Sequence, residues 1–151
     1  HYVAVDDDYR YPYNFVRQLS VELERQKDKV VMGIHGSVFT RPFDSFTRSR
    51  RVFTSWKGLS HQQPVDIVAT CGTIHKVKHL KFDVREWKVT NQVDLHFAKE
   101  MIQRGMRGLL VPKRLFWVLP LAVNQPDSIF VALKGDDFEQ TELAKKLFNL
   151  G

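Results

Sequence analysis

Three adjacent carboxylates, Asp6, Asp7 and Asp8, are the residues of this sequence best suited to chemistry. They directly follow the apolar run 2–5, which is typical of a β-strand, and ligands often bind where strands of α/β sheets end. Asp6 and Asp8 point to the same side if the chain stays extended. Because Mg²⁺ and Mn²⁺ prefer carboxylate oxygens, we predict a metal site on Asp6 and Asp8. The alternative is an exposed acidic turn before a helix.

The elements around the triplet must position it. Tyr11-Pro12 opens a stretch with apolar residues at helical spacing, which predicts a helix to about Gln26. The same spacing predicts two further helices, at about 92–103 and 138–150. Apolar runs predict strands at 2–5, 30–34, 52–56, 65–69 and 109–111. Strands that alternate with helices indicate an α/β domain.

The composition limits the class of protein. A length of 151 residues fits a single domain, and 43% hydrophobic residues exclude a wholly disordered chain. No apolar run approaches the ~20 residues that a membrane helix needs. The single cysteine, Cys71, excludes an intrachain disulfide and is expected to be a small buried filler. The net charge of +6 permits nucleic acid, anionic lipid or phosphorylated ligands as partners.

Other residues are candidates with two interpretations each. Asp94 lies at the start of a predicted helix, where it suits a catalytic carboxylate or, with Asn91 as N-cap, a capping box. His35 follows a strand and either touches a ligand or is structural. The basic cluster of Arg48, Arg50 and Arg51 is either a solvated face or a mobile loop that folds over a diphosphate. The basic stretch 75–81 is expected to be a solvated face. The last candidates are the tryptophans Trp56, Trp87 and Trp117. Trp117 follows a basic pair and is therefore the best placed of the three to line a cleft.

The segment Val5-Asp6-Asp7-Asp8-Tyr9-Arg10-Tyr11-Pro12 resembles the aspartate motif of GT-A-fold glycosyltransferases, in particular bacterial members that act in polysaccharide and capsule synthesis. Further segments resemble this family in the same order, and the resemblance covers roughly residues 2–121. They are 33–37, 70–73, 91–98 and 114–119.

The resemblance implies a fold. It is a mixed, mostly parallel sheet flanked by helices, GT-A-like, with residues 1–151 as one domain that forms the C-terminal part of the catalytic domain. The nucleotide-binding half of the family would precede His1, so we expect the sheet to have an open, externally paired or covered edge near 3–5. The sequence departs from the family at Val93, where an acid often precedes the catalytic Asp, and it has no histidine after His96.

The resemblance also implies an activity, the metal-dependent and inverting transfer of a sugar from a nucleotide diphosphate sugar to a hydroxyl of an acceptor glycan. Asp94 would be the catalytic base. Asp6 and Asp8 would bind Mn²⁺ or Mg²⁺, and Asp6, Asp7, Arg48 and Arg51 would contact the nucleotide diphosphate. The expected substrate contacts are His35, Gly72, Thr73 and Trp117.

The expected setting is cytoplasmic, with an option to lie peripherally at the inner face of the membrane, and without nucleic acid as a partner. Two other functions stay open. One is a different metal-dependent phosphoryl or nucleotidyl transferase, since acids at a strand end with nearby Arg and Lys suit that chemistry. The other is a basic nucleic-acid-binding domain, supported by the net charge and the cluster 48–51.

Overall fold

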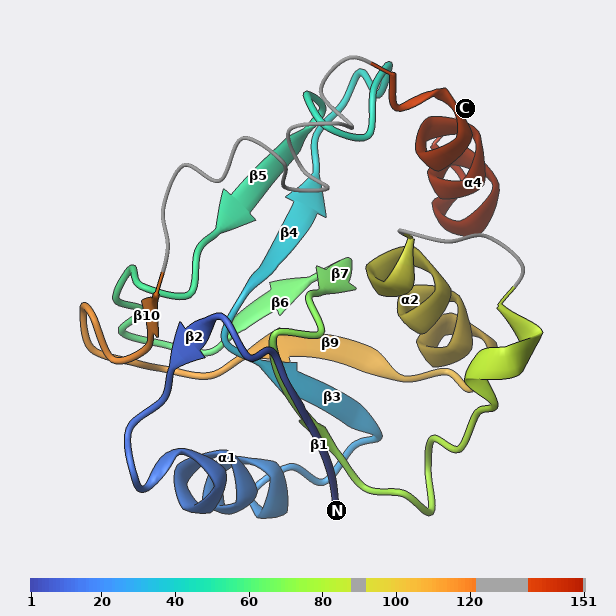
Figure 1. The fold of residues 1–151 in the computed structure, drawn as a ribbon. Helices are drawn as coiled ribbons and strands as arrows, with labels where there is room; N and C mark the ends of the chain where they lie inside the picture. The colour runs from blue at the N-terminus through green and yellow to red at the C-terminus, as the bar shows by residue number, and fades with distance from the viewer. Residues whose placement is uncertain (88–91, 122–135, 151) are drawn as a thin grey trace.

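The computed structural model describes residues 1–87, 92–121 and 136–150 (Figure 1). This part of the chain forms a small mixed α/β domain with three α-helices, a short 3₁₀ helix at Val84–Glu86 and three small sheets. The α-helices are α1 (Phe15–Glu24), α2 (Val93–Gln103) and α4 (Phe138–Phe148). All three confirm the helices that apolar spacing predicts.

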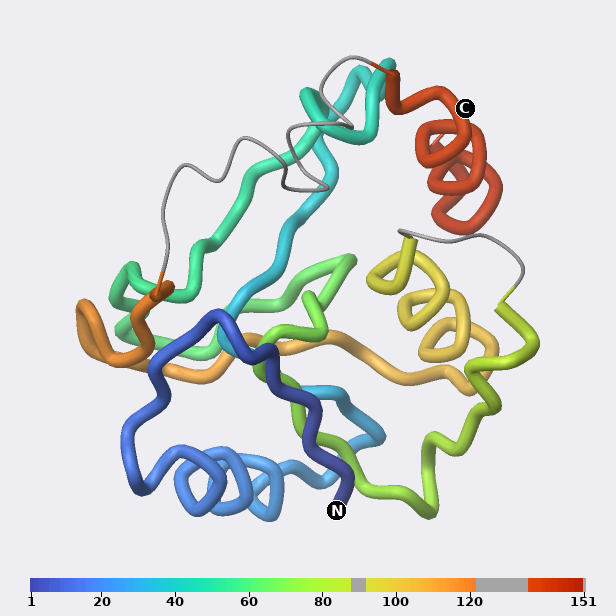
Figure 2. Tube along the Cα trace, in the orientation of Figure 1, coloured from blue at the N-terminus to red at the C-terminus, as the bar shows by residue number. Residues whose placement is uncertain are grey.

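The largest sheet has five strands in the order β1-β8-β3-β9-β6. Its strands are β1 (Tyr2–Val5), β3 (Val30–Gly33), β6 (Gln63–Val65), β8 (Gly72–His75) and β9 (Arg107–Leu110). Only β3 and β9 pair in parallel, while β1–β8, β8–β3 and β9–β6 pair antiparallel. Figure 2 shows the N-terminal trace beside the green trace that contains β8.

The expected mostly parallel, GT-A-like sheet flanked by helices is therefore wrong. The cause is β8, which enters between β1 and β3 and runs against both. The expected open edge near 3–5 is confirmed, because within the described residues β1 pairs with β8 alone.

Two smaller sheets complete the fold. A three-stranded sheet has the order β5-β4-β7, and a two-stranded sheet joins β10 to β2. Their strands are β2 (Tyr9–Arg10), β4 (Gly36–Phe39), β5 (Arg50–Phe53), β7 (Ile67–Val68) and β10 (Leu119–Pro120). In Figure 1 the long β4–β5 ribbon projects away from the five-stranded sheet.

The predicted strand at 65–69 is divided between two sheets. Val65 ends β6 and Ile67 begins β7. Asp66 lies between them, and its Oδ2 accepts a hydrogen bond of 2.7 Å from the backbone N–H of Phe39. The backbones of β4 and β7 pass so close here that a Cβ on Gly36 would collide with the carbonyl oxygen of Ile67. Glycine at position 36 therefore lets β4 approach β7.

The core lies on both faces of the five-stranded sheet. On one face α1 buries Phe15, Leu19 and Leu23 against β3 and its neighbours, and on the other α2 buries Phe97 and Met101. Side chains of a strand alternate between faces, so β3 contributes to both layers. A third cluster joins α2 and α4 to the three-stranded sheet. This packing fixes the start of α2 close to the loop that joins β7 to β8.

Candidate functional site

The acidic triplet occupies the turn between β1 and β2, and all three residues are exposed, although the carboxyl group of Asp6 is partly desolvated. The backbone N–H of Asp6 donates to the hydroxyl of Tyr11 at 3.1 Å. That hydroxyl in turn donates to the carbonyl oxygen of Cys71 at 2.5 Å. Tyr11 thus ties the triplet to the loop between β7 and β8.

The same loop holds Asp94. The Oδ1 atom of Asp94 accepts hydrogen bonds from the backbone N–H of Thr70 at 3.0 Å and from its hydroxyl at 3.1 Å. Asp94 is the second residue of α2, after Gln92 as N-cap. Its hydrogen bonds run to Thr70, 24 residues earlier in the chain, and Asn91, which we predicted as the cap, lies outside the described residues.

Hydrogen bonds place Asp94 and the triplet at the same loop, although 86 residues separate Asp8 from Asp94. Tyr11 joins the backbone of Asp6 to Cys71, and Thr70, the residue before Cys71, donates to Asp94. We call these four carboxylates the acidic cluster. The pKa directions agree with this arrangement: partial desolvation and the charges of Asp8, Asp94 and Asp7 raise the pKa of Asp6, and burial raises the pKa of Asp94 against the hydrogen bonds from Thr70.

The acidic cluster also affects the pKa of Cys71. Its side chain is buried, and burial together with the charges of Asp6 and Asp94 raises the pKa of the thiol. The thiol therefore stays protonated at neutral pH and is unsuited to be a nucleophile. This agrees with Cys71 as a small buried residue.

The donor set can be compared with what a divalent cation needs. Within residues 1–87, 92–121 and 136–150, no group of three or more His, Cys, Asp and Glu side chains is arranged to hold a metal ion. Asp6 and Asp8 nevertheless provide two hard oxygen donors in a negative cluster whose mutual repulsion a cation would relieve. These two residues alone do not complete a metal site, so a Mg²⁺ or Mn²⁺ bound there would need its other ligands from water and substrate phosphates.

The predicted substrate contacts lie in different surroundings. Gly72 and Thr73 belong to β8 in the sheet interior, and both are buried. His35 lies between β3 and β4, and its buried Nδ1 has no hydrogen-bond partner among the described residues. Burial, with the charges of Arg50 and Lys113, lowers the pKa of His35 to about 4, so this ring is neutral at pH 7.

The predicted diphosphate contacts, Arg48 and Arg51, are both exposed. The segment before β5 is anchored rather than loose, because the Asp137 carboxylate accepts hydrogen bonds of 2.7 Å from Ser45 and from Thr47. Arg50, which the sequence placed in the same basic cluster but not among the predicted diphosphate contacts, is half-buried, and the charge of Asp94 acts on it. Strand alternation was the available signal, since neighbours at 50 and 51 must face opposite ways.

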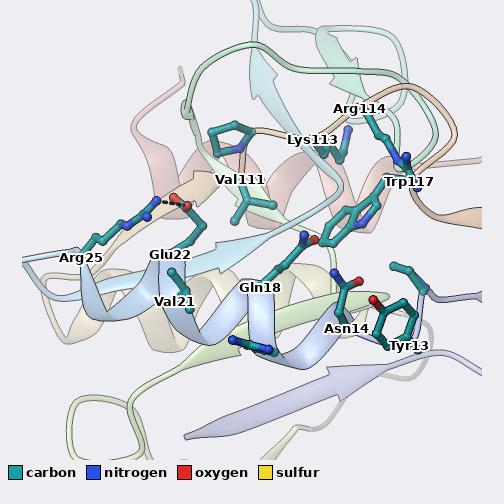
Figure 3. A pocket seen from close by; sticks show the side chains of 13 residues that line it. Tyr13, Asn14, Gln18, Val21, Glu22, Arg25, Val111, Lys113, Arg114 and Trp117 are labelled. Atoms are coloured by element: carbon teal, nitrogen blue, oxygen red, sulfur yellow. Dashed lines mark hydrogen bonds and ion pairs between the residues drawn. The ribbon is translucent and has the colours of Figure 1, made fainter.

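Trp117 lines a separate groove of about 850 Å³ between α1 and the segment after β9. Figure 3 shows Trp117 toward one end of this groove and the ion pair of Arg25 with Glu22 toward the other. None of Asp6, Asp8 and Asp94 lines the groove. The structure thus confirms that Trp117 lines a cleft and does not bring it together with the acidic cluster.

The basic stretch 75–81 also lies apart from the acidic cluster. Its first residue, His75, is buried in β8 and stacks on Tyr2, and Lys76 forms an ion pair with Glu24. His75 and Lys81 line a second cavity of about 580 Å³, again without the acidic cluster.

A scan against models of known protein families found no match for the chain, and a search of curated proteins found no relative. Among the described residues, no helix is long and apolar enough to cross a membrane.

Proposed function

We propose that the chain takes part in the metal-dependent transfer of a sugar from a nucleotide diphosphate sugar to a hydroxyl of an acceptor glycan. The observation that carries this proposal is the loop at Thr70–Cys71, which hydrogen-bonds to Asp94 through Thr70 and is joined to the backbone of Asp6 through Tyr11. The ordered resemblance of the sequence motifs to bacterial polysaccharide and capsule glycosyltransferases supports it. The proposed setting is the cytoplasm, with a peripheral position at the inner face of the membrane as an option.

Asp94 is the proposed base. Both hydrogen bonds from Thr70 use Oδ1, and Oδ2 has no hydrogen bond with the described residues. Oδ2 can therefore accept the proton of the acceptor hydroxyl while Thr70 holds the carboxylate in place. A pKa raised by burial makes this carboxylate a stronger base than an exposed one.

In the proposed step, the acceptor oxygen forms a bond to the anomeric carbon, the bond from that carbon to the diphosphate breaks, and the hydroxyl proton moves to Asp94 Oδ2. Such a direct displacement inverts the anomeric configuration. Asp6 and Asp8 would hold Mg²⁺ or Mn²⁺, which neutralises charge on the leaving diphosphate when bound.

The test is transfer from labelled UDP- and GDP-sugars to a panel of oligosaccharides. Base catalysis contributes about 10²–10⁴-fold, so Asp94→Asn should lower turnover at least ~100-fold while donor binding persists. Asp136→Asn, an exposed carboxylate outside the cluster, is the matched control and should leave turnover unchanged. Near-normal transfer by Asp94→Asn would remove this mechanism, and release of inorganic phosphate without sugar transfer would indicate phosphoryl transfer instead.

A further inference from the structure

The β4–β5 ribbon carries polar side chains with buried atoms that have no hydrogen-bond partner among the described residues. The register pairs Phe39 with Arg50 and Ser37 with Val52, and directly opposed residues share a face. Alternation along β5 puts Arg50 and Val52 on this face and Arg51 on the other. We call the face that carries Arg50 the Arg50 face.

His35 directly precedes β4 and Thr54 directly follows β5, beside the pair Gly36 and Phe53. The buried polar atoms without a hydrogen-bond partner among the described residues include Arg50 Nε, His35 Nδ1 and Thr54 Oγ1. Buried polar groups are normally bonded, so three of them at one ribbon call for an explanation.

Arg50 is the cation of this face. Its guanidinium lies 4.4 Å from the centre of the Phe46 ring, and it has no ion pair or hydrogen bond with the described residues. Burial lowers the pKa of Arg50, while the carboxylates of Asp94 and Asp137 act in the opposite direction. A guanidinium remains charged in proteins, so Arg50 presents a positive charge beside the proposed base.

The face is also rigidly held. Asp137 at the start of α4 accepts hydrogen bonds from Ser45 and Thr47, and the backbone N–H of Phe46 donates to the hydroxyl of Thr141 at 2.9 Å. These contacts fix the turn that leads into β5. The guanidinium and the ring of Phe46 are thereby positioned before any ligand arrives, which lowers the entropic cost of binding.

We propose that the Arg50 face binds a negatively charged group, a carboxylate or a phosphate, on a sugar of the acceptor. The guanidinium fork matches two oxygens of such a group. The assignment to the acceptor rests on the proposed function. The Phe46 ring under the Arg50 guanidinium packs in the same core cluster as Leu95, the neighbour of Asp94, and Asp94 would receive the acceptor proton. Binding of the donor diphosphate falls to the triplet in that scheme.

The experiment is an NMR titration of the isotope-labelled chain with glucuronate, glucose 6-phosphate and neutral glucose. We expect at least one anionic sugar to bind about 10-fold more tightly than glucose, as a charge-assisted hydrogen bond implies, and to shift amides of Gly36–Phe39 and Arg50–Phe53. The tighter of the two anionic sugars identifies the group. Arg50→Met should weaken that binding about 10-fold.

Arg51→Met is the matched control, because Arg51 is the exposed neighbour on the opposite face. It should bind the anionic sugar as the wild type does, and the amide spectrum of each variant reports whether it is folded. Equal affinity for all three sugars, or equal losses in both variants, would overturn the proposal. If Arg50→Met does not fold, the uncharged polar variant Arg50→Gln takes its place, and unchanged binding there would likewise overturn it. The titration contains neither metal nor nucleotide sugar, so its outcome is independent of whether sugar transfer is found.

Discussion

Replacing Asp94 by Ala and by Asn separates its hydrogen bonds from its charge. Asp94 Oδ1 accepts from the backbone N–H and the hydroxyl of Thr70, at 3.0 and 3.1 Å. Asn keeps an acceptor oxygen for both donors, whereas Ala removes it. A buried donor without an acceptor costs about 1–3 kcal/mol, so Ala should be less stable than Asn by about 2 kcal/mol. For a domain of this length that lowers Tm by about 4–8 °C.

The negative charge of Asp94 has the opposite effect on folding stability from its hydrogen bonds. Because burial raises the pKa of Asp94 in the folded state, its contribution to stability is fully present below its ordinary pKa of 3.8 and is lost as pH rises through the folded value. At pH 7 the ionised carboxylate therefore opposes folding. Asn carries no charge, so the Asn variant should be at least as stable as the wild type at pH 7, and this advantage should vanish below pH 3.8.

Thermal unfolding followed by circular dichroism at pH 7 and below pH 3.8 measures both effects. We expect the order Asn, wild type, Ala at pH 7, and the difference between Asn and Ala should persist in acid because it reflects the donors of Thr70. Identical Tm values for Ala and Asn would refute the hydrogen-bond argument. An Asn variant clearly less stable than the wild type at pH 7 would refute the electrostatic one.

Two further predictions concern buried polar groups away from Asp94. Burial lowers the pKa of His75 to about 4 from 6.5, so its contribution to stability should be lost as pH falls from 6.5 to 4, and urea unfolding should show a weaker pH dependence in His75→Phe. Hydrogen bonds from Thr47 and Ser45 outweigh burial and hold the pKa of Asp137 at about 2. Asp137→Ala should therefore lower the free energy of unfolding at pH 7 by about 2 kcal/mol, while the neighbouring Asp136→Ala changes it little; equal effects would contradict the anchoring role.

The helices could be predicted because each buries one stripe at a period that the sequence displays, as Phe15, Leu19 and Leu23 do in α1. The directions of the strands could not be predicted, because a local sequence pattern does not encode which strand is the neighbour. The strand Gly72–His75 pairs antiparallel with both of its neighbours. Of the segment 114–119, which the family resemblance likens to a strand, only Leu119 belongs to β10. Phe116 has a left-handed φ of 56°, and its N–H donates to Trp56, which turns the chain before Leu119.

The acidic residues of the candidate site could be predicted from the sequence, but the contacts that join them could not. Asp6, Asp8 and Asp94 stand out by residue type and by their places at a strand end and a helix start. The contacts that join them run through Tyr11 and Thr70, whose partners lie 60 and 24 residues away. Contacts between residues so far apart in the sequence depend on the packed fold, and no local sequence pattern predicts them.

The most direct test of the proposed site is calorimetry of Mn²⁺ binding with and without UDP or GDP. Because the metal would share its ligands between the Asp6 and Asp8 carboxylates and the diphosphate, wild type should bind Mn²⁺ at least about 10-fold more tightly with the nucleotide present. Asp94→Asn should keep this increase, since Asp94 serves the acceptor. The double variant Asp6→Asn/Asp8→Asn should lose it. Equal Mn²⁺ affinity in the double variant and the wild type, with the nucleotide present, would contradict a metal site on the triplet.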